Sequence, residues 1–161
     1  MAKKNAFFQA ILPCALCLFV LVPACRAEDG AIAVVVHKQN SIINISLRDL
    51  RNVYLGDQRF WKGQLVIIPL MRVGGSRERA AALKTLFQMD EQDYRKYWVN
   101  RVFHGEASAA PPELFSNGAA QDAVASIPGA VALVLASQVS SRVKVLKVDG
   151  HLPGEVGYPL Q

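Results

Sequence analysis

The chain has 161 residues, which is enough for one domain of ordinary size but not for two. Apolar residues make up 52% of it and charged residues 19%, which excludes a wholly disordered, collagen-like or coiled-coil protein. Much of the net charge of +5 belongs to the first 27 residues, since residues 28–161 carry 15 basic and 13 acidic side chains, a net charge of +2. So small an excess does not favour nucleic acid binding.

The N-terminal segment has the features of a secretory signal peptide. Lys3 and Lys4 precede an apolar stretch at 11–22, and Pro23 ends any helix there. This stretch is too short for a typical transmembrane helix. We expect a cleaved signal peptide at 1–27 and a periplasmic or secreted mature protein.

All three cysteines, Cys14, Cys17 and Cys25, lie in this predicted signal peptide. Cleavage after Ala27 leaves a mature chain with no disulfide, no thiolate nucleophile and no cysteine ligand for a metal. The alternative is a lipoprotein signal in which Cys25 carries the lipid, although Pro23 fits that signal less well.

The first half of the mature chain alternates strand and helix patterns. The continuous apolar run at 32–36 predicts a buried strand, and a polar turn follows at 37–41. Ser46 then opens a helix that Gly56 ends. After a loop, the apolar run at 65–70 predicts a second strand, and such runs suit a sheet covered on both faces.

The second half continues this alternation. A helix after Ser76 is expected to place on one side Ala80, Leu83, Leu86 and Phe87. A helix capped by Asp90 is expected to place on one face Tyr94, Tyr97, Trp98 and Val102. A short helix at 117–127 and strands at 130–135 and 143–148 complete the pattern. The order predicts a three-layer α/β domain over 28–150 with a mostly parallel sheet, and a C-terminal tail at 151–161.

A Gly-Gly-Ser sequence between a predicted strand and a capped helix is the most informative local feature. Glycines let the backbone approach a bound group, and the first amides of a helix, here those of Ser76, Arg77 and Glu78, lack partners inside it. Together with the Ser76 hydroxyl and the Arg72 guanidinium they suit an anion. The alternative is that Gly74 and Gly75 form only a turn and Ser76 only caps the helix.

Other chemistry has little support in the sequence. His37, His104 and His151 are far apart and show no metal-ligand spacing. Ser76 lacks the Gly-x-Ser-x-Gly motif of a serine hydrolase. We therefore expect no metal, no cofactor and no enzymatic activity.

An aromatic pair in the loop at 57–64, Phe60 and Trp61, is a further candidate contact for a ligand or a partner protein. The aromatic residues of the helix after Asp90 are expected in the core instead, because they recur at helical spacing.

Several of these elements in order resemble the periplasmic phosphate-binding proteins of ABC transporters. The resemblance starts in the helix that ends in Tyr54-Leu55-Gly56 and continues through Trp61, Gly63 and Pro69. It extends through Arg72, Gly75-Ser76 and Pro128-Gly129-Ala130-Val131 to Asp149-Gly150, and covers most of residues 31–150. The short, single-domain members of this group are the most similar.

This resemblance implies one lobe of a type II periplasmic-binding-protein fold and a phosphate or other oxyanion ligand. Arg72 would be the charge clamp, Ser76 the hydroxyl donor, and Gly75 and Arg77 would offer backbone amides. An ABC permease would be the partner, and the role would be uptake or sensing.

The chain also departs from the family pattern. Full-length relatives are about twice as long, and the N-terminal half of their first lobe, with its own phosphate-holding loop, has no counterpart before Ile32. Gly74 stands where relatives carry an Asp that accepts the phosphate proton. Glu78 adds a negative charge to the expected anion site. An alternative function is therefore an envelope protein-interaction module that has lost solute binding and docks a partner, or a second copy of itself, through its open face or through Phe60 and Trp61.

Overall fold

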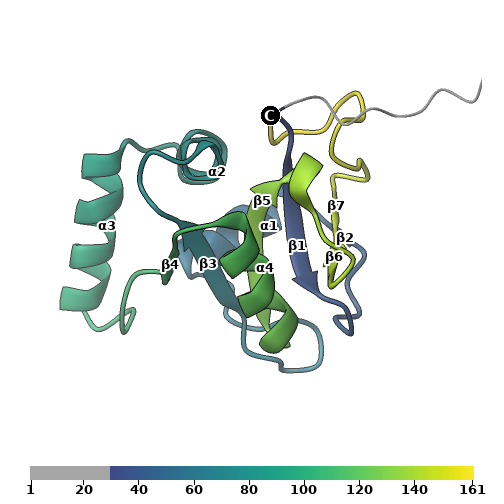
Figure 1. The fold of residues 1–161 in the computed structure, drawn as a ribbon. Helices are drawn as coiled ribbons and strands as arrows, with labels where there is room; N and C mark the ends of the chain where they lie inside the picture. Colours follow the sequence, from purple (N-terminus) through teal and green to yellow (C-terminus); the bar gives the residue numbers. More distant parts are fainter. Residues whose placement is uncertain (1–29) are drawn as a thin grey trace, which may run out of the picture.

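The computed structural model describes residues 30–161, so the predicted signal peptide and Cys25 lie outside the described residues. A five-stranded sheet forms the centre of the molecule (Figure 1). Its strands are, in spatial order, β4 (Glu113–Leu114), β3 (Ile68–Arg72), β5 (Ala130–Leu135), β1 (Ile32–His37) and β6 (Val143–Val145).

The predicted mostly parallel sheet is confirmed. Strand β3 pairs in parallel with β4 and with β5. Strand β1 is antiparallel to both of its neighbours, β5 and β6, so that it alone runs against the direction of the other strands. The carboxyl ends of β3, β4 and β5 therefore meet at one edge of the sheet.

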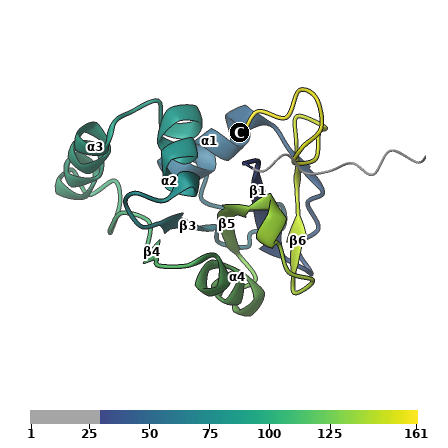
Figure 2. The same ribbon diagram turned by 45° about the horizontal axis from the view of Figure 1, so that its top comes forward.

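Helices cover both faces of this sheet, as the continuous apolar strands predict (Figure 2). In β1, Ile32, Val34 and Val36 face one core, while Ala33 and Val35 face the other. The first core is formed with α1 (Leu47–Leu55), α2 (Arg77–Ala81), the π-helical turn η1 (Ala82–Phe87) and α3 (Glu91–Phe103). The second is formed with α4 (Asn117–Ser126). The three-layer α/β architecture is thus confirmed.

Each of the four α-helices found in residues 30–161 begins at a residue whose side chain caps it. Ser46, Ser76, Asp90 and Ser116 each accept a hydrogen bond from the amide three residues later. Helix α1 ends at Gly56 in the left-handed conformation, as predicted. Local sequence therefore determines where these helices start.

The prediction of a strand at 65–70 was wrong by three residues. Leu65 and Val66 are exposed, and the Leu65 carbonyl accepts from the Trp61 amide at 2.8 Å. A bridge between Phe60 and Val66 completes this local hairpin, so the chain turns back on itself before it enters the sheet. As a result, β3 runs later than expected and ends at Arg72.

The predicted strand at 143–148 is divided. At Leu146 the amide donates to the Val34 carbonyl at 2.9 Å, and the side chain is fully buried. The chain then leaves β6 and forms β7 (Lys147–Val148), which pairs in parallel with β2 (Asn44–Ile45). Two-residue strands of this kind carry no recognisable hydrophobic period.

Two residues expected to face the core are exposed. Ala80 lies on the outer side of α2, and Val102 is 42% exposed near the end of α3. The single-turn α2 continues into the wider η1, which changes the angular spacing of side chains along this helix. On α3, Tyr94 and Trp98 are buried, as predicted.

Residues 151–161, expected to form a tail, lie outside the named helices and strands but contact the core. Tyr158 and Leu160 are buried, and the Tyr158 hydroxyl donates to the Ile32 carbonyl at 2.6 Å. The Ile32 amide donates to the Leu160 carbonyl at 2.9 Å. This segment thus covers the beginning of β1. A short 3-10 turn, η2 (Ala136–Gln138), follows β5.

Candidate functional site

The Gly-Gly-Ser loop connects the carboxyl end of β3 to α2. The Ser76 amide donates to the Val73 carbonyl at 3.3 Å, which closes a tight turn. Gly75 has a φ of +82°, a conformation that favours glycine. Gly74 and Gly75 are exposed, and a Cβ added at either would meet nothing within 4 Å. The loop therefore presents open backbone at the edge of the sheet.

Ser76 caps the helix. Its hydroxyl accepts a hydrogen bond from the Arg79 amide at 3.2 Å. The expectation that the Ser76 amide has no internal partner was wrong, because this amide closes the turn with Val73. What Ser76 still offers a ligand is the proton of its hydroxyl.

Arg72 lies beside an acidic side chain. Its Nη1 donates to the Leu114 carbonyl at 2.6 Å, and its Nε lies 3.7 Å from Oε1 of Glu78. The Arg72 side chain is only 10% exposed and that of Glu78 only 3%. The structure thus brings together the predicted charge clamp and the residue that the sequence marked as unfavourable for an anion.

Arg77 extends to a different place. Its side chain lines a cavity of about 240 Å³ with Gly30, Lys84 and Gln161. A Cβ added at Gly30 would lie 2.8 Å from Nη2 of Arg77, so the guanidinium lies near the start of β1. The Arg77 backbone remains in the first turn of α2, but its side chain does not join Arg72.

A second buried arginine, Arg79, lies behind the loop and was not expected from the sequence. Its guanidinium donates to Glu91 at 2.6 and 2.9 Å and to Glu113 at 2.7 Å. It also donates to the Arg72 carbonyl at 3.2 Å and lies 4.8 Å from the centre of the Tyr94 ring. The only sequence signal was a basic residue three positions after a helix cap, and such residues are usually exposed.

These contacts shift the ionisation of the cluster. The hydrogen bond from Arg79 lowers the pKa of Glu91, and the bond to Glu91 raises the pKa of Arg79. Burial raises the pKa of Tyr94 to about 12. Arg79 is therefore a permanent cation whose charge is balanced by Glu91 and Glu113.

This cluster lies in a groove of about 620 Å³ between the loop and α3. Gly74 and Gly75 form one wall, and α3 contributes Tyr94, Arg95 and Trp98. The groove contains two arginines, Arg79 and Arg95. Because two carboxylates already bind Arg79, the net positive charge that the groove offers an anion is lower than these two arginines suggest.

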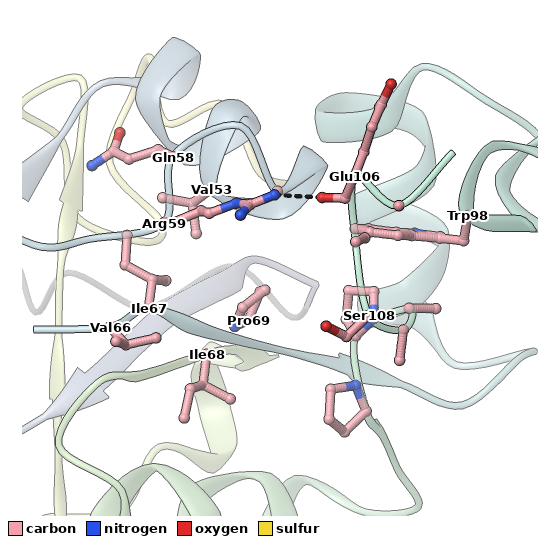
Figure 3. A pocket seen from close by; sticks show the side chains of 17 residues that line it. Val53, Gln58, Arg59, Val66, Ile67, Ile68, Pro69, Trp98, Glu106 and Ser108 are labelled. Carbon is pink, nitrogen blue, oxygen red and sulfur yellow. Dashed lines mark hydrogen bonds between the residues drawn. The ribbon is translucent and has the colours of Figure 1, made fainter. Parts of the chain in front are cut away.

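A second cavity, of about 660 Å³, lies at the amino end of β3 (Figure 3). Val66, Ile68 and Pro69 form one side of it, and Trp98 and residues 105–112 form another. Arg59 donates to the Glu106 carbonyl at its rim. This cavity is mostly apolar and lies away from the Gly-Gly-Ser loop.

The aromatic pair predicted as a contact is separated. Trp61 is 3% exposed and its indole donates to the Gly129 carbonyl at 3.0 Å. Trp61 is therefore a core residue, which rules it out as a docking side chain. Phe60 is 51% exposed.

The histidines do not gather at one site. His37 ends β1, His104 follows α3, and His151 forms a bridge with Val148. Among residues 30–161, no group of three His, Cys, Asp or Glu side chains is placed to hold a metal ion. In the same range, no helix has the length and apolarity needed to cross a membrane.

No protein-family model matches the chain. Its fold is similar to that of an ABC-type phosphate transport receptor from Vibrio cholerae, with a TM-score of 0.62 and 18% identity. A protein described as a phosphate ABC transporter substrate-binding protein from Clostridium perfringens, solved with bound phosphate, has a TM-score of 0.60 and 21% identity. PstS from Borrelia burgdorferi has a TM-score of 0.59 and 16% identity.

Each of these similarities covers 76% of this chain but only 46% to 49% of the other protein. The chain thus spans about half the length of the proteins it resembles. The resemblance drawn from the sequence is confirmed at the level of the fold, which is that of part of a phosphate-binding protein.

Proposed function

We propose that this protein is an exported, non-enzymatic solute-binding domain that holds phosphate or a similar oxyanion beside Arg72. In this proposal the Arg72 guanidinium supplies the charge, the Ser76 hydroxyl donates a hydrogen bond, and the backbone amides of Gly75 and Arg77 face the anion. Binding involves no covalent step. The domain then delivers or senses the anion for an ABC-type permease.

The observation that carries the proposal is the position of Arg72 and its contact with Glu78. It stands at the carboxyl end of a central strand, directly before an open glycine turn and a capped helix. Its guanidinium forms an ion pair with Glu78, whose Oε1 lies 3.7 Å from the Arg72 Nε. A guanidinium that holds one carboxylate in this place has the chemistry to hold another small oxyanion.

The missing acidic residue at Gly74 limits the expected selectivity. Position 74 offers no carboxylate to accept the proton of a protonated phosphate, so we expect phosphate and sulfate to bind with similar affinity. We also expect weak binding, since the chain spans only about half of the two-lobed proteins it resembles.

Thermal unfolding tests the proposal, with phosphate or sulfate titrated at constant ionic strength. A ligand that binds only the folded protein adds about 2.7 kcal/mol at 100 times its Kd, a shift of several degrees in Tm. We expect a saturable shift for the natural protein and none for Arg72→Ala. The matched control is Arg142→Ala, which removes a 57% exposed arginine. An equal shift in Arg72→Ala would refute this site.

A second candidate function is a protein-interaction module. Two observations favour it: Arg72 already holds Glu78, and the neighbouring strand β4 is followed by Phe115, which is 84% exposed. Self-association that survives Arg72→Ala and is lost in Phe115→Ser, with no response to either anion, would support it. Sedimentation velocity measures this directly.

A further inference from the structure

We propose that Glu78 sets the affinity of the Arg72 site by competing with the incoming oxyanion for the guanidinium. This inference rests on the oxyanion binding proposed above. It assigns Glu78 as the residue that determines how strongly the site binds an oxyanion.

The contact between the two side chains is close but incomplete. Oε1 of Glu78 and Nε of Arg72 lie 3.7 Å apart, too far for a hydrogen bond. Both atoms are shielded from solvent, and within the described part of the chain neither has a hydrogen-bond partner. Only the attraction between opposite charges links these two side chains. Burial of two charged atoms without hydrogen bonds lowers the stability of the folded protein.

The other buried arginine provides the contrast. Arg79 makes three hydrogen bonds of 2.6 to 2.9 Å to Glu91 and Glu113, so both carboxylates are firmly held. An anion gains nothing by replacing them. At Arg72 the Nε proton still lacks an acceptor, and an oxyanion oxygen that replaces Oε1 can supply one.

The exchange needs only a side-chain movement. Glu78 lies in the first turn of α2, and the adjoining Gly74 and Gly75 leave the space around their Cα atoms open. Rotation of the Glu78 side chain away from Arg72 exposes the guanidinium without unfolding the helix. If Glu78 stays, its charge repels the anion, and in both cases it weakens binding.

Titration calorimetry with inorganic phosphate tests this competition in four proteins: the natural chain, Glu78→Gln, Arg72→Ala and the control Asp49→Asn. Glu78→Gln keeps the size of the side chain and removes its charge. We expect its phosphate Kd to fall about tenfold or more, because a like charge beside a bound anion is worth at least that much. Asp49→Asn removes an exposed carboxylate from the first turn of α1 and should leave the Kd unchanged.

The outcomes separate this inference from the proposed function. Equal affinity in the natural chain and Glu78→Gln, with binding lost in Arg72→Ala, overturns the competition but leaves the oxyanion site intact. Weaker phosphate binding in Glu78→Gln would show that Glu78 is itself a ligand group, which also overturns the proposed competition. No phosphate binding in any of the proteins refutes both. If Glu78→Gln does not fold, Glu78→Asp shortens the side chain while keeping its charge, and a lower Kd is again expected.

Discussion

Two glycines at opposite ends of the sheet are required for different reasons. Gly75 occupies a turn with a φ of +82° that side chains rarely adopt. Gly129, at the amino end of β5, has an ordinary φ but no space, since a Cβ there would lie 1.9 Å from the Val66 carbonyl oxygen. In the sequence, Gly129 stood out only as part of the Pro128-Gly129-Ala130-Val131 motif that resembles the phosphate-binding proteins. Its steric role depends on Val66, which reaches it from a distant part of the chain.

At the residue scale, we predict that Gly129→Ala strongly destabilises the protein. The added methyl group collides with the Val66 backbone just before β3, so relief requires a backbone shift and the expected cost is about 3 kcal/mol or more. Gly74→Ala is the control, because its added Cβ meets nothing within 4 Å. Urea unfolding of both variants measures the difference, and equal stabilities would show that the close approach is absent.

At the scale of elements, Arg79 connects three parts of the chain that are distant in sequence. It starts from α2 and binds Glu91 at the start of α3 and Glu113 in β4. Phe87 and Tyr94 pack edge to face at 4.8 Å, which adds an apolar contact between η1 and α3. This ion cluster and this aromatic contact hold α3 beside the loop and define the groove next to Gly74 and Gly75.

We predict that Glu91→Gln weakens this attachment in a pH-dependent way. The folded-state pKa of Glu91 lies below its ordinary value of 4.5, so its contribution to stability is present above that pH. The contribution disappears as the pH falls through the lower, folded-state pKa. At pH 7 we expect a loss of about 1 to 2 kcal/mol, a moderate value because Glu91 is 41% exposed.

Urea unfolding at pH 7 and near pH 3 checks this prediction. The difference between the natural protein and Glu91→Gln should shrink as the pH falls, because protonation of the carboxylate removes its charge. Asp93→Asn is the control, because it removes an exposed carboxylate from the same helical turn without touching Arg79. A difference that is independent of pH would contradict the role given to the Glu91 charge.

The elements that the sequence predicted best are those specified by neighbouring residues. The caps at Ser46, Ser76 and Asp90 act within three residues, and they all formed as expected. The division at Leu146 depends instead on a hydrogen bond to the distant strand β1, and the start of β3 depends on the hairpin that joins Phe60 to Val66; both differed from expectation. For the candidate site, the sequence predicted the loop and Arg72. It could not predict the cluster around Arg79, because that cluster forms only where α2, α3 and β4 come together.

At the scale of the whole molecule, the C-terminal segment belongs to the structural core. Leu160 is fully buried, Tyr158 donates to Ile32, and the end of the chain lies beside the start of β1 (Figure 1). The segment has no helical or strand period, and its glycines and prolines resemble those of a tail. Burial of its last side chains therefore could not be predicted from the local sequence.

We predict that Leu160→Ala lowers the free energy of unfolding by about 2 to 5 kcal/mol, as expected for a large side chain removed from a core. Val156→Ala, in the same segment, should change it by less than about 0.5 kcal/mol because Val156 is 95% exposed. Chemical denaturation compares the two variants. Equal and small effects would mean that the segment does not pack as described.

The fold of the described residues is similar to about half of each solved phosphate-transport protein with which it was compared. The proposed function requires that an oxyanion bind at the carboxyl edge of β3, and backbone amide NMR during a phosphate titration tests this residue by residue. We predict saturable shifts centred on residues 72–78, and none of them in Arg72→Ala. Shifts centred on the cavity lined by residues 105–112, or no saturable shift anywhere, would contradict oxyanion binding beside Arg72.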